Sequence, residues 1–374
     1  MVYKQNREMN SRERVLRALR RKEGNPDRVP LQFDLCRQHI EAFGRKLGIE
    51  PDYALSYYED LTYRISANEI RTRMGSDVVV VGGTVPYGYI PKPVSGDITM
   101  NEFGMHMKPT PLYVEVVKCP LDNITTVEEA EAYKFPDPFA PGRFDKAKRD
   151  IDKFAGDYFI IGDVEISLFE MAWHLTGLEK YMIGMMCDEP WIEYLNDRVE
   201  EWSTGLALQL LRAGVDAIWF GEDLGSQTST LISPEEWRIR FKPRHKRMID
   251  RLKNENPDIM IIMHSDGAVA PLIDDFIELG IEVYNPVQPN VEGSDPQELK
   301  DKYGEKISFF GGIDQQALLP SGDIPAIRRE IKRRIEILGK NKGYLLAPAH
   351  IIQTDVTNVT IEEMIKTVLE LGNY

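Results

Sequence analysis

Eight short apolar runs, each bounded by turn residues, constrain the fold of this chain more than any other feature of its sequence. They are rich in β-branched residues and continuous rather than alternating, which is typical of parallel strands covered on both faces. The runs span residues 28–34, 77–83, 158–164, 215–223, 259–264, 281–287, 307–314 and 343–348. Amphipathic stretches lie between most of them, and the one at 233–254 opens with Ser233-Pro234-Glu235-Glu236, a helix start signal.

Strand signals that alternate with helix signals predict an α/β fold, a (β/α)8 TIM barrel. A doubly wound sheet of eight strands is the alternative, but it would need edge strands, and every run here has the composition of a buried strand. The 374 residues fit one barrel, and neither a linker nor an internal repeat divides them, so we expect a single domain over 1–374.

Two segments do not fit the simple repeat. An amphipathic stretch at 11–24 predicts an extra N-terminal helix before the first strand. Residues 84–145 are too long for one crossover, and they contain two β-like pieces followed by a helix signal. We expect this insertion to form a β-hairpin that lies over one end of the barrel.

Composition excludes several classes of partner. With 60 acidic and 46 basic residues the formal charge is −14, which argues against a nucleic-acid or anionic membrane surface. The three cysteines are widely spaced, so the sequence has neither a disulfide framework nor a C-x-x-C motif. The N-terminal stretch is charged, and the sequence has no apolar run near the roughly 18 residues of a membrane span. We expect a cytoplasmic protein that acts on a small molecule.

Polar residues gather just after the apolar runs, where barrel enzymes build their active sites. Those after successive runs are Asp34, Arg37 and Gln38; Asp163 and Glu165; Glu222, Asp223 and Gln227; His264 and Asp266; Asn285 and Gln288; Asp314 and Gln315; and His350 and Gln353. A polar residue in this position is also a common helix cap, and for Asp34, Asp163 and Asp314 that interpretation stays open.

His264 and His350 stand apart because each ends an apolar run on a different strand, so both should face the same end of the barrel. A lone histidine at a strand end is commonly hydrogen-bonded structure. Two of them, with Asp266 two residues after the first, leave a ligand site and hydrogen-bonded structure open as equal alternatives. These three residues are the candidates for a catalytic group.

Six segments in this order resemble the uroporphyrinogen decarboxylase superfamily. They are residues 12–30, 221–237, 264–267 (HSDG), 285–289 (NPVQP), 295–314 and 343–356, and the similarity runs from about residue 10 to the end. The superfamily fold is a (β/α)8 barrel, which agrees with the strand count. It contains decarboxylases and cobalamin-dependent methyltransferases, so the resemblance implies an enzyme of either type.

The decarboxylase branch carries an arginine-rich stretch after the first strand and an aspartate after the second. At the first of these places the chain has only Arg37. At the second it has Gly82-Gly83 and no acidic residue. Without such partners each buried substrate carboxylate would cost several kcal/mol. The resemblance is therefore closer to the methyltransferases than to the true decarboxylases.

The methyltransferase branch binds zinc through an H-x-C motif and a later cysteine. Here the matching positions hold His264, Asp266 and His350, a set that still suits zinc or another divalent metal. The resemblance further implies Glu222 as a fourth metal ligand or as an acceptor for an imidazole N–H. Residues that would orient the substrate are Asp34, Arg37, Gln38, Glu222, Asp223, Gln227, Asn285, Gln288 and Gln353.

Three functions follow as hypotheses. The first is transfer of a methyl group between a corrinoid, carried by a partner protein, and an acceptor at the metal. The second is a metal-free decarboxylase or other lyase that acts on a carboxylate through His264 and Asp266 as an acid–base pair. The third is a non-catalytic barrel that binds a corrinoid or tetrapyrrole. A homodimer is among the expected forms.

Overall fold

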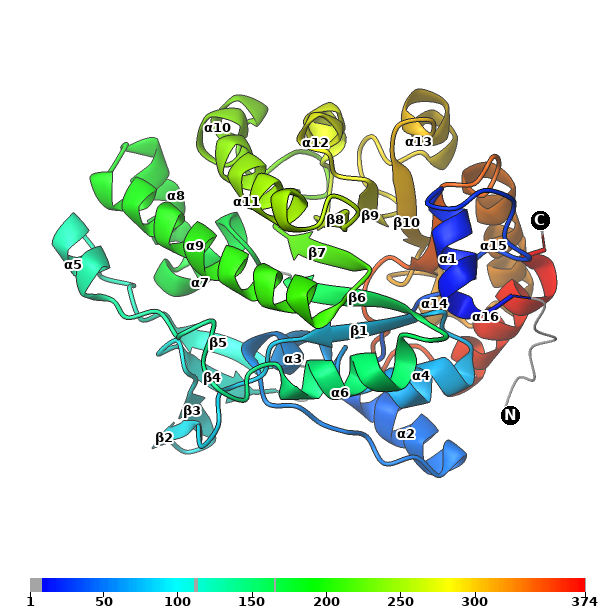
Figure 1. The fold of residues 1–374 in the computed structure, drawn as a ribbon, viewed down its shortest axis with the longest axis horizontal. Helices are drawn as coiled ribbons and strands as arrows, with labels where there is room; N and C mark the ends of the chain where they lie inside the picture. Colours follow the sequence, from blue (N-terminus) through cyan, green and yellow to red (C-terminus); the bar gives the residue numbers. More distant parts are fainter. Residues whose placement is uncertain (1–8, 111–113, 165, 374) are drawn as a thin grey trace.

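Seven parallel strands form the central sheet of the computed structural model, which describes residues 9–110, 114–164 and 166–373. Their order in the sheet follows the chain (Figure 1). They are β1 (Val78–Gly82), β6 (Phe159–Val164), β7 (Ala217–Gly221), β8 (Met260–His264), β9 (Val283–Val287), β10 (Ser308–Ile313) and β11 (Tyr344–Pro348). Each lies inside one of the predicted runs and is buried along its whole length. The prediction of a (β/α)8-type barrel is confirmed.

The first predicted strand, at 28–34, is not a regular strand, and this expectation is corrected. The Leu346 N–H donates to the Pro30 oxygen over 3.0 Å, while the Asp77 N–H donates to the Leu31 oxygen over 2.8 Å. Pro30 has no N–H, and the Leu31 N–H donates to the Asp77 carboxylate instead of a strand. The segment therefore closes the ring between β11 and the start of β1 with only isolated bridges.

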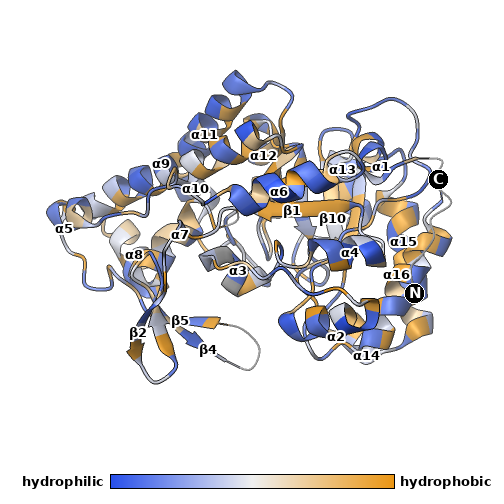
Figure 2. Cartoon of the chain, turned by 60° about the horizontal axis from the view of Figure 1, so that its bottom comes forward, coloured by the Kyte–Doolittle hydropathy of each residue, from blue (hydrophilic) through white to orange (hydrophobic). Residues whose placement is uncertain are grey.

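Helices cover the outer face of the sheet, and the hydropathy colours of Figure 2 show the apolar strands inside them. Before β1, between the strands and after β11 they are α2 (Arg37–Leu47), α3 (Tyr57–Thr62), α4 (Asn68–Met74), α6 (Asp145–Phe154), α7 (Phe169–Thr176), α8 (Leu178–Met186), α9 (Pro190–Ala213), α10 (Pro234–Arg240), α11 (Lys242–Glu255), η1 (Ala270–Leu272), α12 (Ile273–Leu279), α13 (Pro296–Tyr303), α14 (Leu318–Ser321), α15 (Ile324–Leu338) and α16 (Asn358–Leu371). Ser233 caps α10 as predicted, by accepting from the Glu236 N–H over 3.1 Å. Pro243 separates α10 from α11, because a proline lacks the N–H that a continuous helix would need.

The extra N-terminal helix, α1 (Ser11–Ala18), closes the end of the barrel where the strands begin. Its Val15 and the adjacent Leu19 pack in the apolar cluster that fills the barrel. The guanidinium of Arg14 lies 2.7 Å from the Asp77 carboxylate, to which Arg28 is also paired over 2.7 Å. All three side chains are buried. The helix is thus held by apolar packing and by a buried ionic network.

The insertion forms a four-stranded antiparallel sheet, so the expected single hairpin accounts for only part of it. The strands are β2 (Lys92–Ser95), β3 (Ile98–Met100), β4 (His106–Pro109) and β5 (Val114–Lys118), and α5 (Val127–Ala132) follows. The turn between β3 and β4 is made by Asn101, whose Oδ1 accepts from the N–H groups of Phe103 and Met105, each over 3.0 Å. Phe103 packs against Trp202 of α9, which anchors the sheet beside the barrel.

A layer of polar side chains lies at the carboxyl ends of the strands, above the apolar interior of the barrel. We name this polar end of the barrel the mouth. Trp219 of β7 and Phe310 of β10 pack in the inner cluster with ring centroids 5.3 Å apart. They form the apolar floor on which the mouth residues lie. Across the ranges that the structure describes, no helix has the length and apolar character needed to cross a bilayer.

Candidate active site

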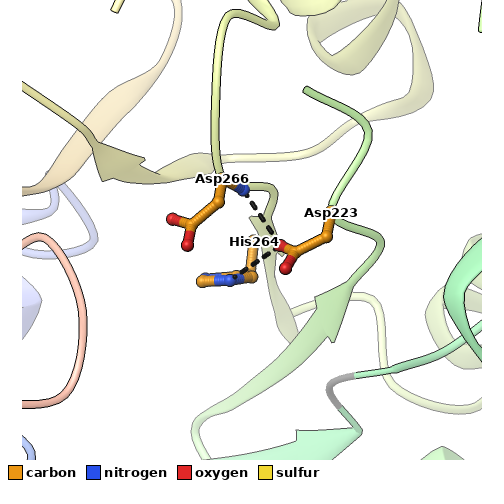
Figure 3. Close-up of side chains that lie close together, drawn as sticks. All are labelled: Asp223, His264 and Asp266. Carbon is orange, nitrogen blue, oxygen red and sulfur yellow. Dashed lines mark hydrogen bonds and ion pairs between the residues drawn. The ribbon is translucent and has the colours of Figure 1, made fainter. Parts of the chain in front are cut away.

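His264 ends β8 and is buried at the mouth of the barrel. Its Nδ1 atom lies 2.7 Å from Oδ1 of Asn285, which occupies the paired position on β9. Its Nε2 atom lies 3.2 Å from Oδ1 of Asp223, just after β7 (Figure 3). The parallel register of three successive strands therefore brings these side chains together.

The contacts of His264 define which of its nitrogens carries a proton. The Asn285 oxygen can only accept a hydrogen bond, so Nδ1 carries the proton. Nε2 then faces a carboxylate oxygen, an arrangement that is favourable only when a proton or another cation lies between them. Burial alone would lower the pKa of His264, but the hydrogen bond to Asp223 and its negative charge raise that pKa to about 9.

Asp223 connects the ends of β7 and β8. Besides facing His264, its Oδ1 accepts a hydrogen bond from the backbone N–H of Asp266 over 3.0 Å. Its backbone has a φ of 38°, which is costly for a residue with a side chain and is common at functional sites. Burial acts to raise the pKa of Asp223, yet the hydrogen bond and positive charge of His264 hold that pKa below its usual range. This carboxylate is therefore ionised.

Asp266 places a third ligating group beside these two. One carboxylate oxygen each of Asp223 and Asp266 and one ring nitrogen of His264 all lie within 4.8 Å of one another. Oδ1 of Asp266 is buried and has no hydrogen-bond partner within the described ranges. Burial and the nearby charge of Asp223 raise the pKa of Asp266. An orphaned carboxylate oxygen next to a second carboxylate and an imidazole fits the requirements of a divalent cation.

His350 follows β11, and its ring centroid lies 6.4 Å from that of His264. It lines a small polar pocket together with Asp266, Gln288 and Asp314. Burial lowers the pKa of His350, which keeps its imidazole neutral and able to bind a metal. The two predicted histidines thus lie at the same mouth, as their positions after two strands predict.

Glu222 lies outside this group. Its carboxylate accepts hydrogen bonds from the Ser167 hydroxyl (2.7 Å) and from the N–H groups of Leu168 (2.9 Å) and Phe169 (2.6 Å). Nε2 of His245 lies 2.9 Å from the same carboxylate. These contacts give Glu222 the position of a cap on the N-terminus of α7.

Asp34 is buried at the mouth but is bound to arginines. Its carboxylate accepts from Arg64 Nε over 2.8 Å, from Gln32 over 2.9 Å and from Arg71. Burial acts to raise the pKa of Asp34, but the charges of Arg64 and Arg71 lower it. Asp34 therefore holds two guanidinium groups in place.

The remaining predicted substrate residues are divided between the mouth and the surface. Gln288 is buried, and its Oε1 accepts from the Gly267 N–H over 2.7 Å. Gln353 is half-buried, whereas Arg37, Gln38 and Gln227 are exposed. Arg37 pairs with Glu41 on its own helix over 3.1 Å and lies over the Tyr53 ring. Glu165, also among the polar residues after a strand, lies outside the described residues.

Arg64 is a mouth residue that the sequence analysis did not predict. It lies in the loop between α3 and α4, away from every strand, and its guanidinium is within 4.2 Å of the Trp219 ring centroid. Asp163 of β6 lies near it, with a carboxylate oxygen 3.8 Å from Arg64 Nη1. Burial raises the pKa of Asp163 to about 6. No local pattern marks Arg64, because only the tertiary fold brings its loop to the mouth.

Comparisons with known proteins show the family and the fold of this chain. The chain is 23% identical over 159 residues to the chloroplastic uroporphyrinogen decarboxylase 1 of rice, a match that spans 42% of this chain and only 36% of that protein. A methyltransferase from Methanosarcina mazei has the same fold, with a TM-score of 0.72 at 18% identity, covering 97% of this chain and 99% of that one. A family model described as uroporphyrinogen decarboxylase (URO-D) matches residues 100–371. The chain therefore belongs to the uroporphyrinogen decarboxylase family.

Proposed function

We propose that this protein is a metal-dependent methyltransferase that moves a methyl group between a corrinoid and an acceptor. The observation that carries the proposal is the position of His264, whose Nε2 faces Asp223 beside the orphaned Oδ1 of Asp266. The M. mazei methyltransferase, which shares the fold over almost the whole chain, supports the same reaction class.

The ligand set would be His264, Asp223 and Asp266, with His350 at the edge of the same space. Nitrogen and oxygen ligands of this kind suit zinc or another divalent cation. When bound, such an ion would lower the pKa of an acceptor thiol or hydroxyl and so favour its nucleophilic form.

The protein's own residues would prepare this site. Asn285 accepts the Nδ1 proton of His264, which orients the ring and keeps Nε2 toward the ligand position. The Asp266 N–H donates to Asp223, so these two carboxylate residues of the set are joined by a hydrogen bond. Gln288, His350 and Asp266 line the adjoining pocket, where we expect part of the acceptor to bind.

Two features support methyl transfer over porphyrin decarboxylation. Arg37, the one arginine in the segment where decarboxylases carry several, is exposed and paired with Glu41. Gly82 and Gly83 stand where those enzymes have an aspartate. A substrate with many carboxylates would lack both sets of partners. We expect the corrinoid to be carried by a separate protein and the reaction to take place in the cytoplasm.

A metal-free lyase is the second candidate, and the His264–Asp223 pair favours it. An imidazolium with a pKa near 9 is protonated at neutral pH and can act as a general acid toward a carboxylate substrate. This reaction would show a bell-shaped pH dependence that chelators do not change.

Elemental analysis separates the two candidates. Protein purified without chelators or a metal-affinity tag should contain about one divalent ion per chain, and His264→Ala should lose the ion together with methyl transfer from methylcobalamin to thiols. His350→Ala should weaken metal retention. A wild-type protein that holds no metal when supplied with zinc, or a His264→Ala variant that keeps both metal and activity, contradicts the proposal.

A further inference from the structure

An open cavity of about 500 Å³ lies outside the mouth, among the segments that follow β7, β8 and β9. Its apolar walls are formed by Pro234, Ala268, Ala270, Leu299 and Tyr303. It shares no lining residue with the small pocket of Asp266 and His350. Cavities of roughly 300–1,000 Å³ with mainly apolar walls and a few polar groups are the usual sites of small organic ligands. This cavity is therefore a candidate binding site that is separate from the candidate metal site.

Backbone contacts among three loops fix the shape of the cavity. The Ala268 N–H donates to the Ser226 oxygen over 2.8 Å. The Glu292 N–H donates to the Gln227 oxygen over 3.1 Å. Gly225 packs so closely on the loop after β8 that a Cβ atom there would lie 2.6 Å from the Ala268 nitrogen. A ligand would therefore meet walls that are already in place, which lowers the free-energy cost of binding.

Two carboxylates line the cavity without an ion-pair partner among the described residues. They belong to Glu292 and Glu298, and both residues are exposed. Glu298 lies in the first turn of α13, where its charge also favours the helix, but Glu292 precedes the helix and has no such role. Lys302 lines the same cavity, and its Nζ atom lies over the Tyr303 ring and 3.9 Å from the Asp274 carboxylate. The charge that the cavity leaves uncompensated is therefore negative.

We propose that this cavity binds a small organic amine. The ammonium group pairs with Glu292 and Glu298, and the apolar part of the amine packs against Leu299 and Tyr303. A metal ion fits less well, because Glu292 and Glu298 belong to no group of three ligating side chains within the described ranges. The site lies outside the mouth, so the proposal goes beyond the proposed function and does not depend on it.

Equilibrium binding measured by ligand-observed NMR tests this site without turnover. The probes are phenethylamine, the uncharged phenethyl alcohol and the anion hydrocinnamate, which share a ring and a short chain but differ in charge. The wild type should bind the amine at least about fivefold more tightly than the alcohol, the gain that one or two exposed ion pairs supply. It should bind the anion most weakly. A wild type that binds the alcohol or the anion as tightly as the amine overturns the proposal.

Variants of the two glutamates locate the ammonium group. In the double variant Glu292→Gln/Glu298→Gln the preference for the amine over the alcohol should fall below about twofold, whereas each single variant should give an intermediate value. Glu336→Gln is the matched control and should keep the wild-type preference, because Glu336 is exposed on α15 and lies 3.7 Å from Lys332. Circular dichroism checks the fold of each variant, and if the double variant does not fold, the single variants decide. Glutamate variants that keep the full preference contradict the assignment.

Two further arms separate this site from the mouth and define the ligand. Asp223→Asn and Asp266→Asn each remove a carboxylate of the mouth, and both variants should bind phenethylamine as tightly as the wild type does. Loss of the amine from either variant would place the amine at the mouth and reject the separate site. Methylammonium has the charge but almost no apolar surface, so it should bind at least about tenfold more weakly than phenethylamine. Equal binding of these two amines would reject the contact with the apolar walls and with it the organic ligand.

Discussion

Oδ1 of Asp223 lies 3.2 Å from Nε2 of His264 and 3.0 Å from the backbone nitrogen of Asp266. One oxygen atom thus joins the ends of two neighbouring strands and sets the charge of the buried imidazole. The contact between Asp223 and His264 explains why a histidine and a carboxylate occur where β8 leaves the core.

The first prediction concerns the pH dependence of stability in metal-free protein. His264 has a pKa of about 9 in the fold against 6.5 in a free chain, so its protonation stabilises the fold fully below pH 6.5. This contribution is lost as the pH rises through 9. Asp223→Asn removes the charge that raises this pKa, so its melting temperature should fall less than that of the wild type between these pH values. Thermal unfolding at a series of pH values, with chelator present, measures the difference.

An NMR titration of the histidine side chains gives an independent check. The signal of His264 should titrate near pH 9 in the wild type and move well below that in Asp223→Asn, where burial dominates. A His264 signal that titrates at the same pH in both proteins would show that Asp223 does not control the imidazole.

The second prediction concerns Asn285. Replacing it by alanine removes the acceptor for the Nδ1 proton of His264, so the ring loses its orientation. Metal affinity should fall about 10- to 100-fold, the usual effect of removing a hydrogen-bond partner of a metal-binding histidine. Competition with a fluorescent zinc chelator measures the affinity, and Asn256→Ala, at the surface end of α11, serves as control. Equal affinities in the Asn285→Ala variant and the wild type contradict the role.

The third prediction separates Glu222 from the metal. The Glu222→Gln substitution replaces the carboxylate that accepts the N–H groups at the start of α7 by an uncharged amide. The free energy of unfolding should fall by about 1–3 kcal/mol. The metal content of the folded variant should equal that of the wild type. Urea unfolding and elemental analysis on the same preparations test both parts. Loss of the metal without loss of stability would instead make Glu222 a ligand.

The fourth prediction concerns the closed end of the barrel. Asp77→Ala leaves the buried guanidinium of Arg28 and part of that of Arg14 without a partner, and should lower the free energy of unfolding by about 3–5 kcal/mol. Glu201→Ala, which breaks an exposed pair with Arg198, should cost about 1 kcal/mol or less. Chemical unfolding of both variants gives the comparison, and similar losses would mean that burial does not govern the ionic network.

Much of the fold could be predicted because seven of the eight runs have a composition that local physics turns into a buried parallel strand. The eighth could not, because Pro30 lacks a donor and because Asp77, distant in sequence, takes the Leu31 N–H. The number of strands in the insertion was also predicted too low. Its β2 segment, Lys92–Ser95, is exposed and has no apolar period that would mark a strand.

The candidate site was partly accessible from sequence. His264, Asp266 and His350 come to one mouth because the ends of parallel strands meet there, which is a property of the architecture. The position of Arg64 on Trp219 depends on how the loop between α3 and α4 folds back, and no short pattern encodes that. Sequence alone also could not separate Asp223, which faces His264, from its neighbour Glu222, which faces α7.

The closing segment at 28–35 is hydrogen-bonded to β11 and to the residues after it, so the barrel is closed by two parts of the chain that lie far apart in sequence. A ribosome-bound chain that ends before β11 has all of β1 to β10 but an open edge beside β10. His350 is also absent from such a chain. The arrangement of the mouth is therefore complete only after β11 and His350 have emerged, and a nascent chain would expose unpaired strand edges until then.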